Sequence, residues 1–275
     1  MNKIYIFGSR GYIGTHLKKQ LNNKYDIFLF NNILIDKTYK KYLRIADSSD
    51  ICINLTSIIG EDCEKNKNKS KAINIDLNKE ISDSKIGRII FTSTSSLYGT
   101  QSEPCSENAK LTPTNFYTES KLIAENILKS SKKYLILRPA LCFGGTENIS
   151  TNNFINSFII KTLNKEKIEI FDINSYRPYI PVNMVAKMIE KLIEKKIINE
   201  VYNLGYSNMN LRKFDLIKKL NIVGRKNIYQ FKPKKKSRNY KLNCTKIEKL
   251  LELKKINILE EVLKSFKQIK YDCQK

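Results

Sequence analysis

The chain has 275 residues, of which 41% are hydrophobic, and a formal net charge of +23. This length is sufficient to bury a sizeable core. No apolar run reaches the roughly 18 residues that a membrane helix needs, and an apolar strand pattern starts at Lys3, which leaves no room for a signal peptide. We therefore expect a globular, cytoplasmic protein without a membrane segment.

The side chains that usually bind metals or form disulfides are few. None of the six cysteines forms a CxxC pair, and His16 is the only histidine. A structural zinc site usually needs four cysteine or histidine ligands at short spacings. We expect reduced thiols, no metal, and a packing or solvent-facing role for His16.

Lysine supplies most of the positive charge, since only 8 of the 50 basic residues are arginine. With abundant isoleucine and asparagine, this composition is typical of an A/T-rich genome, with lysines spread over solvated faces. Net charge bears on solubility and nonspecific association more than on fold, so nucleic acid is not expected as a partner. The densest basic cluster, 232–241, could meet the phosphate of a small nucleotide or of a polymer.

The first half of the chain alternates short apolar strands with helical segments, which is typical of a parallel sheet covered by helices. The predicted strands are 3–7, 26–30, 50–55, 88–93 and 134–138, and the predicted helices are 12–22, 64–82 and 116–132. The link 31–50 has only 20 residues, so its usual helix or strand is missing or very short. The pattern predicts an α/β fold with a Rossmann-type, doubly wound parallel sheet in residues 1–150.

The pattern loosens after Arg138-Pro139. Helices are predicted at 153–164 and 184–196 and from about 211, 245 and 258, and strands at 168–171, 201–204 and 227–231. We expect residues 151–275 to form a smaller α/β lobe that binds the substrate, with segments near 177–205 returning to the first sheet.

A glycine turn, Gly8-Ser-Arg-Gly11-Tyr-Ile-Gly14, stands between the first predicted strand and helix 12–22. Glycines allow the backbone to turn tightly and to approach a pyrophosphate, while the helix N-terminus offers free amides and partial positive charge. This order predicts a dinucleotide site, with a simple tight turn as the alternative.

The choice of dinucleotide depends on the end of the second predicted strand. NAD enzymes usually place Asp or Glu there to bind the ribose hydroxyls, whereas Asn31 stands there in this chain. Arg10, inside the glycine turn, could face a 2′-phosphate instead. These two residues favour NADP(H) over NAD(H).

Tyr117 and Lys121 lie four residues apart in predicted helix 116–132 and so share one face, about one turn apart. An ammonium there stabilises the phenolate and lowers the pKa of the tyrosine from about 10 toward working pH. Together with the glycine turn, this pair predicts a nicotinamide-dependent enzyme in which the tyrosine moves a proton while the cofactor moves a hydride.

A run of hydroxyl side chains, Phe91-Thr-Ser-Thr-Ser-Ser-Leu-Tyr-Gly99, leaves predicted strand 88–93. A hydroxyl at the carboxyl end of a central strand can donate a hydrogen bond to a substrate oxygen beside the tyrosine. The alternative is a loop whose serine and threonine side chains form their own backbone turns.

In this order the motifs resemble the extended short-chain dehydrogenase/reductases, the NAD(P)-dependent epimerase/dehydratase group that acts on nucleotide sugars. The resemblance spans nearly the whole chain. Besides the segments above it rests on Asn54-Leu-Thr-Ser57, Asn74, Pro113-Thr-Asn-Phe-Tyr117, Leu137-Arg-Pro-Ala-Leu-Cys-Phe-Gly144, Arg177-Pro-Tyr-Ile-Pro-Val-Asn-Met-Val-Ala186 and Val201-Tyr-Asn-Leu-Gly205.

The resemblance implies a role for individual residues. Tyr117 is the expected acid/base, Thr94 the catalytic hydroxyl that also contacts substrate, and Lys121 the residue that binds the nicotinamide ribose. Asn153, Arg177 and Arg238 match positions that contact the nucleotide diphosphate of the sugar substrate. The residues expected at the cofactor are Gly8, Arg10, Gly11, Tyr12, Ile13, Gly14, Asn31, Leu55, Thr56, Ser57, Asn74, Tyr117, Lys121 and Pro139.

Residues that differ from the family pattern reduce the number of possible reactions. Ser95-Ser96 stand where sugar-nucleotide dehydratases place Asp-Glu, which disfavours a dehydratase. GDP-fucose-synthase-like enzymes share the arginine of the glycine turn, but they use a cysteine at position 96 and a second-lobe histidine. A 4-epimerase and a 4-keto reductase both stay open, because Arg10 and Asn31 favour the reductase and the second-lobe match favours the epimerase.

The alternative from another class is a non-catalytic dinucleotide-binding sensor or scaffold, with a basic surface that contacts nucleic acid. The intact Thr94, Tyr117 and Lys121 argue against it, because a binding protein has no need for that trio. The resemblance also suggests a homodimer formed through helices 64–82 and 116–132, although the outer faces of these helices are rich in lysine.

Overall fold

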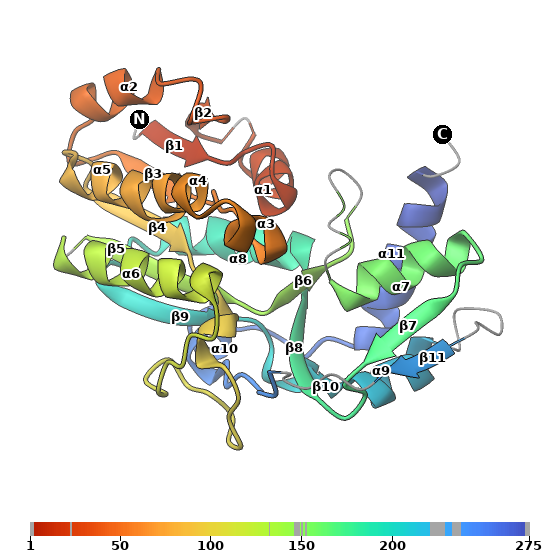
Figure 1. Cartoon of the computed structure of the whole chain (residues 1–275). Coiled ribbons are helices and arrows are strands. Elements are labelled where there is room, and N and C mark those ends of the chain that lie inside the picture. Colours follow the sequence, from red (N-terminus) through yellow and green to blue (C-terminus); the bar gives the residue numbers. More distant parts are fainter. Residues whose placement is uncertain are drawn as a thin grey trace.

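The computed structural model describes residues 3–22, 24–131, 133–145, 149, 151, 153–220, 229–232 and 238–272. A large parallel sheet carries helices on both faces, and a smaller lobe with two small sheets lies beside it (Figure 1). The α/β fold with a Rossmann-type, doubly wound sheet is therefore confirmed. None of the described helices is long and apolar enough to cross a membrane.

The large sheet has six strands in the order β2-β1-β3-β4-β5-β9, and all neighbours pair in parallel. The strands are β1 (Lys3–Phe7), β2 (Asp26–Phe30), β3 (Ile51–Asn54), β4 (Arg88–Thr92), β5 (Tyr134–Pro139) and β9 (Glu200–Leu204). Because β2 and β3 lie on opposite sides of β1, the direction of winding switches there. Open α/β sheets bind ligands at such a switch point, beyond the carboxyl ends of the strands.

Successive side chains of the strands enter two different cores, as the two-residue period of a strand requires. Ile4 and Ile6 pack in the core under α1 (Tyr12–Leu21) and α8 (Val182–Glu194), whereas Tyr5 and Phe7 pack in the core on the other face. These four side chains are completely buried, and burial of each contributes about 1.5–3 kcal/mol to folding. The helices of the other face are α2 (Tyr39–Ile45), α3 (Gly60–Lys65), α4 (Lys67–Lys71), α5 (Leu77–Asp83) and α6 (Phe116–Ser130).

The short link 31–50 contains one helix, α2, and no strand, so the expected shortening is confirmed. Without that strand, β2 is the last strand at its side of the sheet.

The helix predicted over 64–82 is instead divided into α3, α4, a π-helical turn η1 (Ala72–Asp76) and α5. α3 ends where Asn66 leaves helical geometry, with φ −121° and ψ 58°. Within the π turn, the Asn74 side chain is buried against the loop after β3 and against α6, and Asn78 Nδ2 donates to the carbonyl oxygen of Asn74 at 2.9 Å. Hydrophobic periodicity does not reveal this interruption, because it depends on polar side chains that face inward.

The second lobe combines a three-stranded sheet, β10-β8-β6, with a two-stranded sheet, β11-β7. Its elements are β6 (Leu141–Phe143), α7 (Phe154–Leu163), β7 (Ile168–Phe171), β8 (Tyr176–Pro181), η3 (Ser207–Met209), β10 (Asn210–Arg212), α9 (Lys213–Leu220), β11 (Tyr229–Lys232), α10 (Thr245–Leu250) and α11 (Ile258–Asp272). The predicted strand 227–231 corresponds to β11, although residues 227 and 228 lie outside the described residues.

The sequence did not predict β6, β8 and β10. β6 and β10 have only three residues each, and β8 contains Pro178 and Pro181. Proline cannot donate a backbone hydrogen bond and therefore argues against a central strand, yet β8 lies between β10 and β6. Helix α9 also begins two residues later than predicted, because β10 takes the preceding residues.

Candidate functional site

A cavity of about 720 Å³ opens at the switch point of the large sheet. The glycine turn lies on one side of it, the loop 55–59 after β3 on another, and the link residues 32–35 close a third side. Gly8 has φ +83°, which favours glycine, and a Cβ on Gly14 would lie 2.1 Å from the carbonyl oxygen of Gly8. The two positions therefore require glycine for the backbone to form this turn at the start of α1.

Asn31, the residue that follows β2, forms hydrogen bonds with the glycine turn. Its Oδ1 accepts the backbone N–H of Arg10 at 2.9 Å, and its Nδ2 donates to Ser9 Oγ at 2.9 Å. The expected contact between Asn31 and a ribose thus competes with hydrogen bonds inside the protein. The side chain of Arg10 is exposed beside this turn.

Asn74 fixes the loop that lines the cavity opposite the glycine turn. It is completely buried, its Oδ1 accepts the backbone N–H of Ile58 at 2.9 Å, and its Nδ2 donates to Ser120 Oγ in α6 at 3.0 Å. The structure therefore places Asn74 behind the loop 55–59. From there it links that loop to the helix of Tyr117.

Leu55, Thr56 and Ser57 all lie on the wall of the same cavity, as the sequence predicted. Thr56 is held in place because its backbone N–H and its hydroxyl both donate to Asn54 Oδ1, at 3.0 and 2.6 Å. Ile13 packs against the core under α1, and Pro139 ends β5 as a half-buried residue.

Tyr12, also expected at the cofactor, instead joins the two lobes through its hydroxyl. The hydroxyl donates to the carbonyl oxygen of Gly144, and Asn156 Nδ2 in α7 donates to it at 3.0 Å. Asn156 Oδ1 in turn accepts the backbone N–H of Gly144 at 2.8 Å. A residue of the glycine turn is therefore part of the junction with the second lobe.

The predicted catalytic residues meet at the carboxyl end of β4. Tyr117 lies in the first turn of α6, whose start is fixed by a capping box between Asn115 and Thr118. Thr94 is the N-cap of the 3₁₀ helix η2 (Ser95–Tyr98), and its hydroxyl lies close enough to the phenol of Tyr117 to lower the pKa of that phenol. Lys121, only 1% exposed, donates from Nζ to the carbonyl oxygen of Thr92 at 2.9 Å.

Burial governs the acidity of both groups. It raises the pKa of Tyr117 to about 12, while the nearby Thr94 hydroxyl and the positive charge of Arg238 act in the opposite direction. It lowers the pKa of Lys121 to about 7, against the raising effect of Glu125. The four-residue spacing predicted that Lys121 would lower the pKa of Tyr117; in the structure, burial of the phenol outweighs the charges around it.

Arg238 lies near enough to Tyr117 for its charge to act on the phenol, and Arg177 in β8 lies beside Tyr240. Burial lowers the pKa of Arg177, and the like charge of Arg238 lowers it further, so the two guanidinium groups lie close together. Neither forms a salt bridge with a carboxylate among the described residues, and Arg238 Nη1 is buried without a hydrogen-bond partner there. Two neighbouring cations without a carboxylate suit an anionic ligand.

Asn153 has a structural contact of its own, because its side chain caps α7 by accepting the backbone N–H of Asn156 at 2.8 Å. Residues 233–237 of the basic cluster lie outside the described residues.

Tyr240 was not predicted from the sequence, and Ser95 was not predicted to contact the second lobe. Tyr240 is 1% exposed, and its hydroxyl lies 3.0 Å from Ser95 Oγ. The guanidinium of Arg177 lies 5.7 Å from the centre of its ring, and the phenol acts on the pKa of Tyr117. No spacing motif joins Tyr240 to Tyr117, since the contact depends on how the second lobe folds back onto the first.

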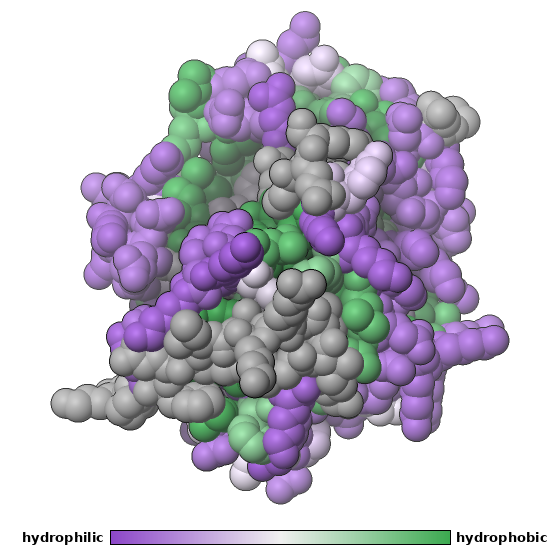
Figure 2. Space-filling model, turned by 90° about the vertical axis from the view of Figure 1, so that its right-hand side faces the viewer, coloured by the Kyte–Doolittle hydropathy of each residue, from purple (hydrophilic) through white to green (hydrophobic). Residues whose placement is uncertain are grey.

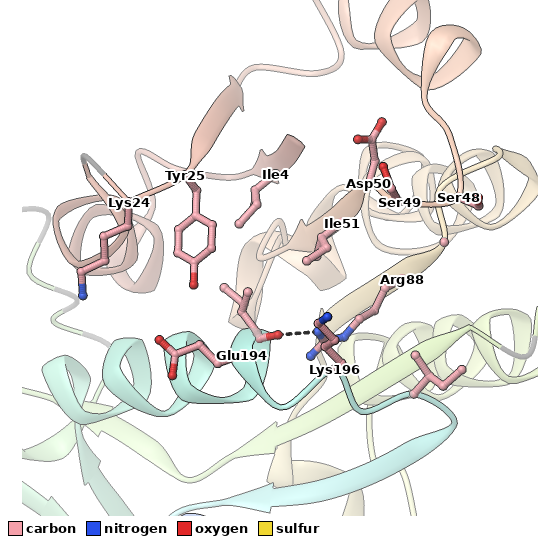
Figure 3. Close-up of a pocket in the computed structure, with 13 residues that line it drawn as sticks. Ile4, Lys24, Tyr25, Ser48, Ser49, Asp50, Ile51, Arg88, Glu194 and Lys196 are labelled. Atoms are coloured by element: carbon pink, nitrogen blue, oxygen red, sulfur yellow. Dashed lines mark hydrogen bonds between the residues drawn. The ribbon is translucent and has the colours of Figure 1, made fainter. Parts of the chain in front are cut away.

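A second cavity, of about 530 Å³, lies at the amino end of the large sheet, far from Tyr117 in the fold (Figure 3). Arg88, at the start of β4, points toward the end of α8 and donates to the carbonyl oxygens of Leu192 and Ile193. A cation at the C-terminus of a helix satisfies its last carbonyl groups, so Arg88 has a structural role there.

The chain contains no group of three or more cysteine, histidine or acidic side chains placed to hold a metal, within the described ranges. Cys52, Cys63, Cys105, Cys142 and Cys244 are free thiols, and Cys273 lies outside those ranges. Lysines of the described surface pair with carboxylates in several places, among them Lys232 with Glu169 and Lys246 with Glu200. The face shown in Figure 2 is largely hydrophilic at its rim, with hydrophobic surface in the hollow near its centre.

Several solved structures that are similar to this chain are enzymes named for nucleotide sugars. UDP-glucuronic acid 4-epimerase from Bacillus cereus, solved with UDP-glucuronic acid and NAD, matches with a TM-score of 0.84 and 21% identity, over 98% of this chain and 99% of that chain. UDP-N-acetylglucosamine 4-epimerase from Methanobrevibacter ruminantium M1 matches with a TM-score of 0.84 and 19% identity, over 98% of each chain. dTDP-glucose 4,6-dehydratase from Bacillus anthracis, solved with NAD, matches with a TM-score of 0.80 and 16% identity, over 100% of this chain and 98% of that chain.

At these identities the structural matches establish the fold. A search of curated protein sequences found no match. The sequence model of the NAD dependent epimerase/dehydratase family matches residues 4–205, which include the glycine turn, Thr94, Tyr117 and Lys121. The chain therefore belongs to the NAD dependent epimerase/dehydratase family, as its motifs indicated.

Proposed function

We propose that the chain is an NAD(P)-dependent 4-epimerase of nucleotide-diphosphate sugars. The observation that carries the proposal is the placement of the Thr94 hydroxyl beside the phenol of Tyr117, whose pKa it lowers, with Lys121 buried one turn along the same helix. Two of the similar structures are 4-epimerases of UDP-sugars, which supports epimerisation over the other reactions of the family.

Tyr117 would move the proton. Its phenolate takes the proton from a sugar hydroxyl and so becomes the phenol, which returns the proton when the ketone is reduced; the Thr94 hydroxyl polarises the same oxygen. A bound nicotinamide dinucleotide supplies the acceptor and donor of hydride. Arg177 and Arg238 would hold the diphosphate of the sugar nucleotide and so orient its sugar toward Tyr117.

The cavity at the switch point fits a dinucleotide. The close approach of Gly8 and Gly14 leaves the backbone of the turn open to a pyrophosphate. The loop 55–59 and Lys121 would contact the remainder of the molecule.

Replacement of Tyr117 tests the proposal. Tyr117→Phe should lower kcat for epimerisation of UDP-sugars by about 10²–10⁴-fold, because positioned acid/base groups contribute that much, and leave the cofactor Kd within about threefold. Tyr134→Phe, at the other end of the sheet in β5, is the matched control. Interconversion of UDP-glucuronic acid and UDP-N-acetylglucosamine with their 4-epimers is followed by NMR.

Two results contradict the proposal. Equal turnover by wild type and Tyr117→Phe would remove the proton-transfer role. A wild-type protein that binds dinucleotide but converts no nucleotide sugar would support the non-catalytic sensor or scaffold.

A 4-keto reductase is the second candidate, favoured by the glycine-turn arginine and the missing acid at the end of β2. In that case the protein consumes NADPH with a 4-keto sugar and releases the oxidised cofactor. An epimerase instead retains its cofactor and shows no net change in nicotinamide absorbance.

The preference for NADP(H) rests on Arg10 and on the missing acid at Asn31, whereas the similar structures were solved with NAD. If Arg10 binds a 2′-phosphate, Arg10→Ala should raise the Kd of NADPH about tenfold, the worth of one charge-assisted hydrogen bond, and leave that of NADH within twofold. Fluorescence titration measures both constants. If the Kd values of both dinucleotides rise equally, Arg10 does not recognise the 2′-phosphate.

A further inference from the structure

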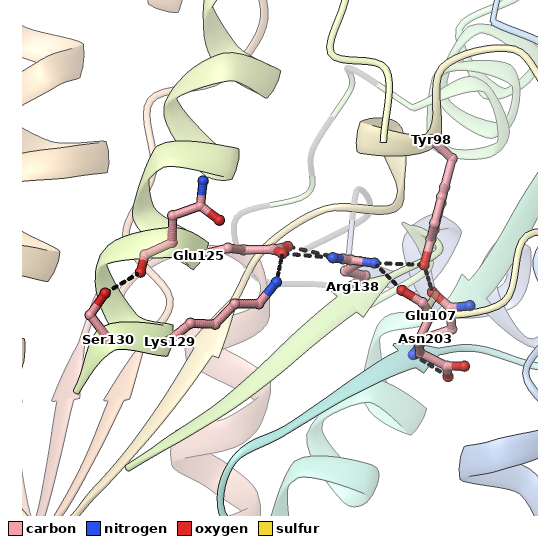
Figure 4. A network of polar contacts seen from close by, with 8 residues as sticks. Tyr98, Glu107, Glu125, Lys129, Ser130, Arg138 and Asn203 are labelled. Carbon is pink, nitrogen blue, oxygen red and sulfur yellow. Dashed lines mark hydrogen bonds and ion pairs between the residues drawn. The ribbon is translucent and has the colours of Figure 1, made fainter. Parts of the chain in front are cut away.

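One buried guanidinium joins the two elements that carry the catalytic residues (Figure 4). Arg138 in β5 is 2% exposed, and it donates from Nε and Nη2 to both carboxylate oxygens of Glu125, at 3.0 and 2.7 Å. Glu125 is completely buried and lies one turn after Lys121 in α6. A bidentate pair of this kind fixes both the distance and the rotation of α6 relative to β5.

The remaining arm of the same guanidinium holds the turn of Thr94. Arg138 Nη1 donates to the hydroxyl of Tyr98 at 3.0 Å and to the carbonyl oxygen of Glu107 at 2.9 Å. Tyr98 is the last residue of η2, the 3₁₀ helix that begins at the Thr94 cap. The Tyr98 hydroxyl donates onward to Asn203 Oδ1 in β9 at 2.7 Å, so the turn is also fixed to the neighbouring strand.

We propose that Arg138 is a positioning residue, which sets the distance between the hydroxyls of Thr94 and Tyr117 by holding η2 and α6 on β5. The proposal rests on the proposed function, because these hydroxyls are the pair to which proton transfer is assigned. A lysine could not replace it, since its ammonium lacks the rigid fork that reaches Glu125 and Tyr98 together.

Glu125 extends this arrangement to Lys121. Burial lowers the pKa of Lys121 to about 7, and the negative charge of Glu125 raises it. The carboxylate that anchors α6 therefore also favours the protonated form of the buried lysine.

Arg138→Lys and Arg88→Lys form a matched pair for the test. Both arginines are buried, but Arg88 is bonded to the end of α8 at the opposite end of the sheet. Since small misplacements of reacting groups can cost about 10²-fold in rate, we expect Arg138→Lys to lower kcat about 30-fold or more, with substrate KM and cofactor Kd within about threefold. Arg88→Lys should keep kcat within about twofold once activity is corrected for the folded fraction.

Hydrogen exchange supplies a readout that needs no substrate. Arg138→Lys should speed amide exchange about tenfold in both 95–98 and 116–130, and Tyr98→Phe should do so only in 95–98. Arg88→Lys should leave both segments unchanged.

Unchanged exchange in either segment of Arg138→Lys overturns the proposal. So does a kcat that falls only in proportion to the folded fraction. If the wild type converts no nucleotide sugar, the proposed function fails, and exchange still decides whether Arg138 couples the two elements.

Discussion

At Tyr117 and Lys121, the surroundings of each side chain decide its charge. Burial favours the neutral forms of both groups, with pKa values of about 12 and about 7. Thr94 and Arg238 partly offset this effect at the tyrosine, as Glu125 does at the lysine. An anionic substrate held near Arg238 would remove part of that help, so substrate binding and the acidity of Tyr117 are coupled.

The lowered pKa of Lys121 predicts how stability depends on pH. Between about pH 7 and pH 10 the unfolded chain keeps the proton that folded Lys121 has lost, so the free energy of unfolding should rise with pH in this window. Between pH 7 and pH 9 the contribution is about 2 kcal/mol. Lys121→Met should remove this rise, as measured by urea unfolding at the two pH values without added cofactor. The same rise in both proteins would assign it to other groups.

At the scale of single elements, the interrupted helix between 60 and 83 matters most. Its π turn places the Asn74 side chain between the loop 55–59 and α6, so the cofactor side and the tyrosine side of the site share one amide. A continuous α-helix would not put an inward-facing asparagine at that point and keep the apolar residues on both sides in the core.

Loss of the Asn74 side chain should therefore affect binding and stability together. Asn74→Ala leaves buried partners of its hydrogen bonds unsatisfied, and we expect a loss of about 2–3 kcal/mol in the free energy of unfolding and a cofactor Kd raised about tenfold. Asn68→Ala, at an exposed position of α4, is the control. If Asn74→Ala is destabilised but binds cofactor as tightly as wild type, the hydrogen bonds of Asn74 to the loop 55–59 do not contribute to cofactor binding.

The elements differ in how far their sequence predicts them. β1, β3 and β4 are short, continuous apolar runs, and they were predicted to within two residues because full burial leaves a clear pattern. β8 was missed, since its two prolines argue against a strand whose neighbours are remote in sequence.

The features of the candidate site also differ in how far the sequence predicts them. Glycine turns and the Tyr117–Lys121 spacing are local signals that a sequence shows directly. The contacts of Tyr240 with Ser95 and with Arg177 arise from the return of the chain after residue 200, and no local pattern encodes them. The pKa values depend on burial, which also becomes visible only in the folded chain.

At the scale of the whole molecule, the two lobes meet where Tyr12 contacts Gly144 and Asn156. The same turn is expected to hold the cofactor pyrophosphate. Binding of dinucleotide should therefore also restrain the orientation of the second lobe, with its two arginines, before sugar nucleotide arrives.

We also propose a homodimer, formed through the outer faces of the helical segment 64–82 and of α6. Ile123 in α6 is 43% exposed, and Ile59 beside α3 is 42% exposed. Ile123→Asp should convert a dimer to a monomer in sedimentation experiments, because an aspartate would be buried at such an interface without a partner. Ile198→Asp, at an equally exposed isoleucine (45%) in another part of the molecule, should leave the oligomeric state unchanged. A wild-type monomer at high concentration would contradict the proposal.

The missing strand of the link 31–50 also affects whether strands of different molecules can pair. β2 is an edge strand of the large sheet. A strand of another molecule could therefore pair with its apolar segment Ile27-Phe-Leu-Phe30. Edge strands are protected against such pairing when they are short and carry charge. β2 has five residues, and its first residue, Asp26, is exposed. Asp26 thus places a negative charge at the edge where a strand of another molecule would pair.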